Sequence, residues 1–203
     1  MTDNRIYLFD TTLRDGQQTR GVDFTPADKI AIARALDEIG IDYVEGGWPG
    51  ANPTDDRFFA EPPKLERATL VAFGMTRRPG RSAENDPGLA GVLGSKAGAA
   101  CLVGKTWDFH VDVALEIDRD ENVQMIRDSM ALAIKRGFEP MFDCEHFFDG
   151  YKANRHRERL GQHSGSRARR SAAGAGHDQR PGRALRQCEY RHPDGDPWPE
   201  DGL

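Results

Sequence analysis

Short apolar runs alternate with longer amphipathic stretches through the first 154 residues of the chain. Strands that alternate with helices at this spacing predict right-handed βαβ units around a parallel sheet, so the expected fold class is α/β. The predicted strands are the runs rich in β-branched and aromatic residues, at 6–10, 41–45, 69–75, 99–104 and 139–144.

The first predicted helix covers residues 25–40. Thr25 is suited to cap it, Pro26 to occupy its first turn and Gly40 to end it. Its apolar residues recur at helical spacing and predict a buried face made of Ile30, Ala33, Leu36 and Ile39.

Three further helices are expected in the first part of the chain. Residues 54–65 form a broken helix with Thr54 as a possible cap, and residues 82–98 provide a helical turn or two. The pattern is clearest in residues 118–137, where one face is predicted to carry Val123, Ile126, Met130 and Ile134.

The pattern of strands and helices stops after Asn154. Residues 155–203 contain no Val, Ile, Met or Phe and are rich in Arg, Gly, Ala, Ser, His and Pro. Such a segment buries too little apolar surface to offset the cost of ordering it, so we predict a disordered Arg/Gly-rich tail. The predicted organisation is therefore one α/β unit, residues 1–154, followed by the tail, residues 155–203.

Composition and charge support this division. The net charge of −5 is the sum of −8 in residues 1–154, from 12 Arg, 6 Lys and 26 acidic residues, and +3 in residues 155–203, from 10 Arg and 7 acidic residues. No run approaches the ~20 apolar residues of a membrane span, and no secretory signal is visible. Three cysteines without disulfide or zinc spacing favour reduced thiols and a cytoplasmic protein.

Polar clusters follow all five predicted strands, where function is located in parallel α/β sheets. They read DTTLRD, EGGWPGANP, GMTRRPG, GKTWDFH and DCEHFFDGY. Within the first cluster, Arg14 and Asp15 are adjacent. A carboxylate suits a hard divalent cation and a guanidinium suits a substrate carboxylate or a developing oxyanion, although a solvated charge pair is an equal alternative on local grounds.

The segment DTTLRDGQQ resembles the signature of the pyruvate-carboxyltransferase superfamily of TIM barrels, which includes isopropylmalate synthases, homocitrate synthases and HMG-CoA lyases. Four further segments, YVEGGWPGANPTD, GKTWDFHV, ENVQMIRDSM and DCEHFFDGYKAN, are similar to its (R)-citramalate synthase branch. The resemblance covers residues 6 to 154. It implies a truncated TIM (β/α)8 barrel with about five βα units.

The resemblance also implies an activity. Enzymes of this branch are acyltransferases that condense acetyl-CoA with pyruvate and hydrolyse the thioester to release CoA and citramalate, in branched-chain amino-acid biosynthesis. A divalent metal, Mg²⁺ or Mn²⁺, polarises the keto acid, and full-length members are expected to be homodimers.

Residue roles follow from the same resemblance. Asp15 would be the metal ligand, Arg14 would stabilise the oxygen that becomes negative, and Glu145 would act as an acid/base or orienting carboxylate. Gln18 would contact the bound keto acid or the metal shell. Glu45 and the adjacent Gly46–Gly47 pair would shape the floor of the substrate pocket.

The chain departs from the family pattern after Asn154. The family completes its metal site with a His-x-His pair and precedes it with a DT-N-GG segment, and neither occurs in this sequence. A barrel takes about 250 residues and eight strands. We therefore predict a shift of reading frame after Asn154, and a truncated chain that is inactive as written.

Three alternatives remain open at this point. The chain could derive from a 2-isopropylmalate synthase-like enzyme or from an acyl-CoA lyase of the same superfamily. It could also be a non-enzymatic scaffold whose genuine basic tail binds nucleic acid through phosphates. The tail's net charge of only +3, with its acidic residues grouped among prolines, argues against nucleic acid as a partner.

Overall fold

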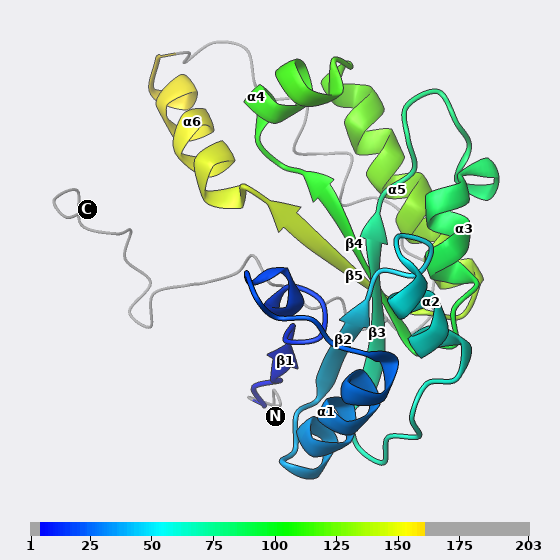
Figure 1. The fold of residues 1–203 in the computed structure, drawn as a ribbon. Helices are drawn as coiled ribbons and strands as arrows, with labels where there is room; N and C mark the ends of the chain where they lie inside the picture. Colours follow the sequence, from blue (N-terminus) through cyan, green and yellow to red (C-terminus); the bar gives the residue numbers. More distant parts are fainter. Residues whose placement is uncertain (1–4, 161–203) are drawn as a thin grey trace, which may run out of the picture.

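The computed structural model describes the backbone of residues 5–160 and the side chains of residues 5–153. Five parallel strands form one sheet in the order β1-β2-β3-β4-β5, so that strands adjacent in the sequence are adjacent in space (Figure 1). This confirms the predicted parallel α/β sheet. The strands are β1 (Phe9–Asp10), β2 (Tyr43–Gly47), β3 (Thr69–Met75), β4 (Ala99–Lys105) and β5 (Glu139–Glu145).

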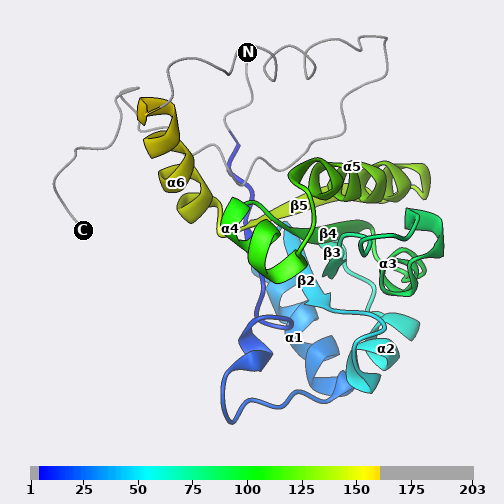
Figure 2. The same cartoon turned by 90° about the horizontal axis from the view of Figure 1, so that it is seen from above.

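Helices α1, α2, α3 and α5 connect successive strands and cover one side of the sheet, whereas α6 follows the last strand and projects away from it (Figure 2). The longer ones are α1 (Pro26–Glu38), α2 (Pro53–Ala60), α3 (Pro87–Leu93), α5 (Arg119–Lys135) and α6 (Phe147–Leu160). Short helical segments lie in the loops at the carboxyl ends of β1, β3 and β4: η1 (Gly16–Gln18), η2 (Ala83–Asn85), α4 (Asp108–His110) and η3 (Val111–Leu115).

Two separate apolar clusters follow from the alternation of side chains along the strands. The outer cluster lies between the sheet and the helices and includes Val44, Ala72 and Leu102 of the strands with Phe58 and Leu132 of the helices. The inner cluster lies on the opposite face of the sheet and consists of Tyr43, Val71, Phe73, Ala99, Cys101 and Met141.

The sheet curves around this inner cluster. Tyr43 Oη of β2 donates a hydrogen bond to Glu139 Oε1 of β5 at 2.9 Å, although β3 and β4 lie between these strands. Small Ala99, which is fully buried on the intervening β4, lies in the same inner cluster. The described residues therefore form the curved part of a (β/α) barrel, with β1 and β5 at its two edges.

The predicted strand positions are accurate for β3, β4 and β5 and less accurate for β1 and β2. The first strand was predicted from residue 6, but Ile6 and Leu8 are exposed and the ladder begins at Phe9. Leu8 instead bonds to residue 42, donating its N–H to the Asp42 carboxylate and accepting from the Asp42 N–H. The second strand runs on to Gly47, with a register irregularity between Glu45 and Gly47.

Helix α1 has the predicted Thr25 cap, which forms a reciprocal capping box with Asp28. The predicted cap of α2 was wrong. Asn52, not Thr54, accepts the Asp55 N–H at 2.9 Å, because Pro53 provides the first residue of the helix and moves its start forward. The helix ends at Ala60, just before two consecutive prolines at 62 and 63.

The predicted apolar faces of two helices were partly wrong. Ile39 lies beyond the end of α1 and is exposed, and so are Val123 and Ile134 of α5. The buried face of α5 contains two polar residues, since Ser129 donates to the Met125 carbonyl and the Asn122 amide donates to the Lys105 carbonyl. Polar side chains that are hydrogen-bonded within the protein can be buried, so the buried face of a helix need not show the periodic pattern of apolar residues.

Helix α6 continues to Leu160, past the predicted boundary at Asn154. The predictions for the rest of the tail, its disorder and its altered reading frame, concern residues that lie outside the described part of the chain. Among the helices of residues 5–160, none has the length and apolar character needed to cross a membrane.

Candidate active site at the carboxyl ends of the strands

The loop after β1 has a compact, fixed conformation. The Asp10 carboxylate accepts the Thr12 N–H at 2.9 Å, and the Thr11 carbonyl accepts the N–H groups of residues 14, 15 and 16. Leu13 is fully buried in the outer cluster and anchors the loop. This anchoring places Arg14 and Asp15 at the carboxyl edge of the sheet, as predicted from their position after the first strand.

Arg14 is the centre of the site. Its Nε donates to Glu45 Oε2 at 2.6 Å, and its Nη1 lies 3.1 Å from Asp15 Oδ1. Its guanidinium carbon lies 4.0 Å from the centre of the Phe73 ring, a cation–π contact. Three neighbours from β2, β3 and the same loop therefore fix its orientation, and its remaining N–H groups are available to a ligand.

Glu45, which the family resemblance places at the floor of the substrate pocket, lies buried beneath Arg14. Its side chain is only 1 % exposed, and its bonded partner is Arg14. Burial raises the pKa of the Glu45 carboxyl, and the Arg14 guanidinium opposes that rise. Glu45 thus positions Arg14 from beneath, whereas Asp15, whose side chain is 60 % exposed, faces outward from the same guanidinium.

Glu145 ends β5 and forms an ion pair with Lys105, the last residue of β4. The backbone carbonyl of Glu145 accepts the Thr106 hydroxyl at 2.7 Å, which ties the two strand ends together. Asp15 and Glu145 lie at the carboxyl ends of the two edge strands of one parallel sheet, as predicted. Lys105, to which no role was assigned from the sequence, is therefore part of the Glu145 environment.

The sequence analysis missed Asp143. It lies two residues before Glu145 on β5, so both side chains project from the same face of the strand. Burial raises the pKa of the Asp143 carboxyl, Arg14 lowers it, and Glu145 and Asp15 raise it further. Strand alternation counted back from Glu145 is the signal that could have identified it.

Gln18 lies in η1 with its side chain exposed, and it is not among the hydrogen-bond or ion-pair partners of Arg14 and Glu145 in the described part of the chain. The Gly46–Gly47 pair was expected to leave room for a ligand. A Cβ atom at Gly46 would instead lie 2.5 Å from Phe58, and one at Gly47 would lie 2.5 Å from the Asp55 carboxyl carbon. The two glycines make room for side chains of α2.

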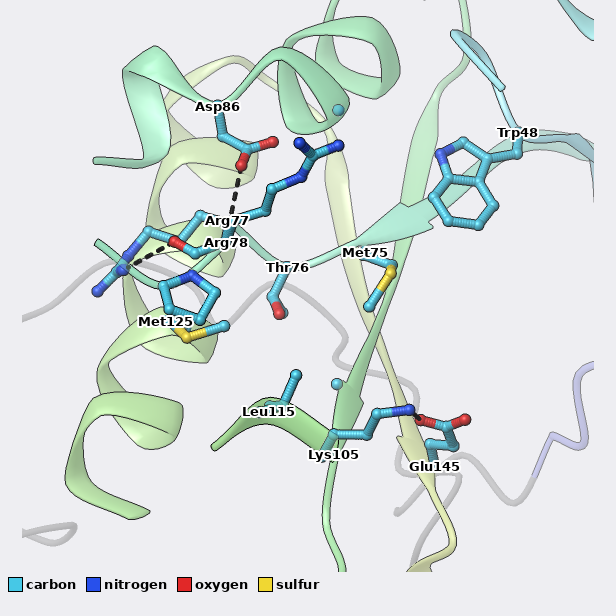
Figure 3. Close-up of a pocket in the computed structure, with 13 residues that line it drawn as sticks. Trp48, Met75, Thr76, Arg77, Arg78, Asp86, Lys105, Leu115, Met125 and Glu145 are labelled. Carbon is cyan, nitrogen blue, oxygen red and sulfur yellow. Dashed lines mark hydrogen bonds and ion pairs between the residues drawn. The ribbon is translucent and has the colours of Figure 1, made fainter. Parts of the chain in front are cut away.

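A pocket of about 260 Å³ lies beside Glu145, between the ends of β3 and β4 and the start of α5 (Figure 3). Trp48, Met75, Leu115 and Met125 contribute apolar walls. Lys105 and Glu145 lie together on one side, and Arg77 and Arg78 come from the loop after β3 on the opposite side (Figure 3).

The described residues do not form a complete metal site. Within residues 5–153 no three His, Cys, Asp or Glu side chains are grouped so that they could hold an ion. Asp15 offers one outward-facing carboxylate, whereas Mg²⁺ requires six oxygen ligands in near-octahedral geometry. The residues present therefore do not fit the divalent cation implied by the family resemblance.

The arrangement is suited to an anionic substrate that reacts near a carboxylate. Arg14 provides oriented donors for a carboxylate or a developing alkoxide, and Glu145 provides a partly exposed carboxylate at the other edge of the curved sheet. Arg14 does not line the pocket next to Glu145, so its donors and the pocket are two distinct features of this edge of the sheet.

Comparison with known proteins agrees with these observations. The HMGL-like family model matches residues 5–154. Over 155 residues the chain is 48 % identical to an (R)-citramalate synthase from Streptomyces coelicolor, covering 75 % of this chain and 29 % of the relative. It is 29 % identical over 143 residues to a 2-isopropylmalate synthase from Solidesulfovibrio magneticus, covering 70 % of this chain and 27 % of that one.

The fold also has relatives among solved structures. Hydroxymethylglutaryl-CoA lyase from Pseudomonas aeruginosa is similar with a TM-score of 0.53 at 17 % identity, covering 68 % of this chain and 45 % of the lyase. At that identity the likeness concerns the fold alone. The chain spans less than a third of the length of the curated relatives named above.

Proposed function

From the premise that this chain belongs to the HMGL-like family, we propose that it is the amino-terminal part of an acyltransferase that condenses acetyl-CoA with pyruvate to give citramalate. The observation that carries the proposal is the 48 % identity to an (R)-citramalate synthase across the residues that build the site. The lower identity to a 2-isopropylmalate synthase, 29 %, favours pyruvate over a larger 2-oxo acid.

In this proposal Arg14 binds the 2-oxo acid. Its Nε is held by Glu45 and one Nη by Asp15, so the remaining donors point at a substrate oxygen from a fixed position. Because the guanidinium is oriented before the reaction, stabilising the negative oxygen costs little reorganisation. The Arg14 guanidinium lowers the pKa of the Asp143 carboxyl, and in this proposal the attraction between the two side chains helps to set the orientation of Arg14.

Glu145 acts as the proton acceptor. Its carboxylate takes a proton from the methyl carbon of the acetyl thioester, and the resulting enolate carbon forms a bond to the keto carbon of pyruvate. The electron pair of the keto group moves to its oxygen, which then receives a proton. Water cleaves the thioester, so the products are citramalate and CoA thiol. Lys105, paired with Glu145, keeps that carboxylate at the carboxyl edge of the sheet.

We further propose that the chain as written is inactive. Asp15 is the only residue of the expected metal site among those described, and a lone carboxylate holds a divalent ion weakly. Within the described residues β1 and β5 are edge strands that do not pair with each other, so we expect water to reach the inner face between them and to screen charges there. The missing ligands and the remaining strands would come from a segment like that of the longer relatives.

The test is a hybrid protein. Residues 1–154 of this chain are joined to the downstream part of the Streptomyces coelicolor relative, and CoA thiol release is measured with acetyl-CoA and Mg²⁺ or Mn²⁺. Release with pyruvate supports the proposal, whereas release only with 2-oxoisovalerate supports the isopropylmalate alternative. A folded hybrid that releases no CoA with either acid would contradict the proposed reaction.

A further inference from the structure

A single residue, His146, separates β5 from α6. Its φ is 57°, in the left-handed region that residues other than glycine seldom adopt. The His146 carbonyl accepts the Gly150 N–H at 3.0 Å, a bond that starts the helix. His146 thus turns the chain sharply from strand into helix directly after Glu145, the proposed proton acceptor.

The side chain of His146 is fixed by three neighbours. Its ring meets the His110 ring edge-on, with 4.3 Å between the centroids, and its centroid lies 5.9 Å from that of Trp107. Its Nδ1 lies 3.0 Å from Asp149 Oδ2 in the first turn of α6. Because Trp107 and His110 belong to the segment that follows β4, the ring of His146 joins the segments that follow two neighbouring strands.

The backbone at the same point is also closely packed. The Glu145 carbonyl accepts the Thr106 hydroxyl at 2.7 Å and the Thr106 N–H at 3.2 Å. A Cβ atom at Gly150 would lie 2.4 Å from the Thr106 carbonyl oxygen, so glycine allows the first turn of α6 to lie against the end of β4. The segment 145–150 therefore cannot move away from the residues after β4 without breaking these contacts.

His110 takes part through its ring rather than through a hydrogen bond. Its Nδ1 is buried and has no hydrogen-bond partner in the described part of the chain. The ring packs against His146 and against Trp107, with 4.8 Å between the centroids of His110 and Trp107. An unpaired buried nitrogen costs stability, so the ring contacts of His110 must offset that cost.

We propose that His146, held by His110, is a positioning residue that fixes the direction of the Glu145 side chain. Backbone strain of the kind seen at His146 persists only where surrounding contacts impose it. Because the two residues are adjacent, the conformation of His146 decides where the Glu145 carbonyl and carboxylate lie relative to Thr106 and Lys105. The inference rests on the proposed function, since it takes Glu145 as the proton acceptor.

The first test measures hydrogen exchange of backbone amides in the 203-residue chain and requires no turnover. His146→Ala should speed exchange of the Thr106 N–H at least about fivefold, because it removes the ring contacts that hold the acceptor of that bond. The Glu139 N–H, bonded to Gly98 at the opposite end of the β4–β5 pair, should not change. The matched control is Glu116→Ala, since Glu116 is exposed and has a similar φ of 53°.

Three further variants separate the causes. His146→Gly allows the left-handed backbone without strain but lacks the ring, so it should behave like His146→Ala. His110→Phe keeps a ring and removes the unpaired nitrogen, so it should behave like the wild type, whereas His110→Ala should behave like His146→Ala. Wild-type exchange in His146→Gly or His110→Ala would overturn the assignment. Equal acceleration at Thr106 and Glu139 would also overturn it, because that result indicates a general loss of stability.

The second test measures CoA release by the hybrid protein. His146→Ala should lower kcat about tenfold or more and leave KM for pyruvate unchanged, because the proton acceptor is misplaced while Arg14 still binds the acid. His110→Phe should keep the wild-type kcat. Faster Thr106 exchange with an unchanged kcat would show that these contacts hold the backbone without positioning the carboxylate, and would overturn the proposal. A wild-type hybrid without turnover would reject the proposed reaction alone, and the exchange measurements would still decide the role of the two rings.

Discussion

Arg14 and Glu45 meet through a 2.6 Å contact between Nε and Oε2, with the carboxylate almost completely buried beneath the guanidinium. This contact joins the loop after β1 to the interior of β2 across 31 positions of sequence. The Nε of Arg14 is thus bound to Glu45, and the guanidinium donors that are not bound by the protein remain available to a ligand. The first strand pair and the site therefore depend on the same ion pair.

Replacing Glu45 with Gln should weaken both the fold and the site. Arg14 would keep its charge without its buried partner, so we expect the free energy of unfolding to fall by about 3 kcal/mol. Urea unfolding of the variant measures this loss. The control is Glu66→Gln, which affects an exposed pair with Lys64 and should change stability by about 0.5 kcal/mol or less. Equal, small effects of both changes would contradict the structural role of Glu45.

The sequence was sufficient to predict the sheet because its strands carry strong local signals. Residues 70–75 and 99–104 are continuous runs without a polar side chain, and the structure buries all but one residue of each on both faces. It was insufficient at β1, where the apolar residues Ile6 and Leu8 are exposed. An edge strand has one partner, so residues outside its short ladder find other bonds, and no local pattern reveals that.

Asp55 is a second buried carboxylate on which the loop after β2 depends. It forms an ion pair with fully buried Lys29 and accepts the Trp48 N–H at 2.8 Å. Asp55→Asn would leave the Lys29 ammonium buried beside a neutral amide, so we expect a loss of about 3–5 kcal/mol. The neighbouring exposed residue provides the control, since Asp56→Asn should cost about 1 kcal/mol or less. A difference of less than about 1 kcal/mol between the two would show that Asp55 is dispensable.

Gly47→Ala tests the close packing of the same loop. Gly47 has a φ of 145°, and an added Cβ would lie 2.5 Å from the Asp55 carboxyl carbon. Backbone strain and this overlap act together, so we expect a loss of about 3 kcal/mol or more in thermal or urea unfolding. Gly21→Ala separates the two causes, because Gly21 has a φ of 85° with open space around it and should cost only about 1 kcal/mol. Similar losses at both positions would mean that overlap with Asp55 plays no part.

The Asp37 carboxylate should make the free energy of unfolding depend on pH in the acidic range. Its carboxylate accepts the backbone N–H groups of residues 66, 67 and 68 at 2.6–2.8 Å, and these bonds lower its pKa. Because folding lowers the pKa of Asp37, its ionised carboxylate stabilises the fold fully above about pH 3.9, the pKa of an aspartate in the unfolded chain. This stabilisation is lost as the pH falls through the pKa of Asp37 in the folded state.

Asp37→Asn should therefore reduce stability by about 2 kcal/mol at pH 7, because an amide NH₂ replaces one accepting oxygen. The difference from the wild type should shrink in urea unfolding at about pH 3, where the wild-type carboxyl itself begins to protonate. Glu38→Gln, an exposed neighbour, should show neither effect. If the variant is less stable than the wild type by the same amount at both pH values, the charge of Asp37 does not contribute to stability.

The candidate site could be predicted only in part. Residues at strand ends were identified because parallel strands bring their carboxyl ends together, which places Arg14, Asp15 and Glu145 at one edge. The partners of these residues could not be predicted. The pairing of Lys105 with Glu145 depends on the register of β4 and β5, and the burial of Glu45 depends on the curvature of the sheet.

The last prediction concerns activity. The 203-residue chain should release no measurable CoA from acetyl-CoA and pyruvate with Mg²⁺ or Mn²⁺, because Asp15 lacks companion ligands among the described residues. The hybrid with the Streptomyces coelicolor downstream segment should release CoA, as should a chain in which the predicted shift of reading frame after Asn154 is reversed. In either completed protein, Arg14→Ala should reduce kcat/KM at least about 10²-fold, since it removes an oriented charged donor at the reacting oxygen. Asp15→Ala should have an equal or larger effect, and Glu66→Gln should have none. Turnover by the 203-residue chain would show that residues 155–203 supply groups for the reaction, and His156, His163, His177 and His192 would be the first to replace.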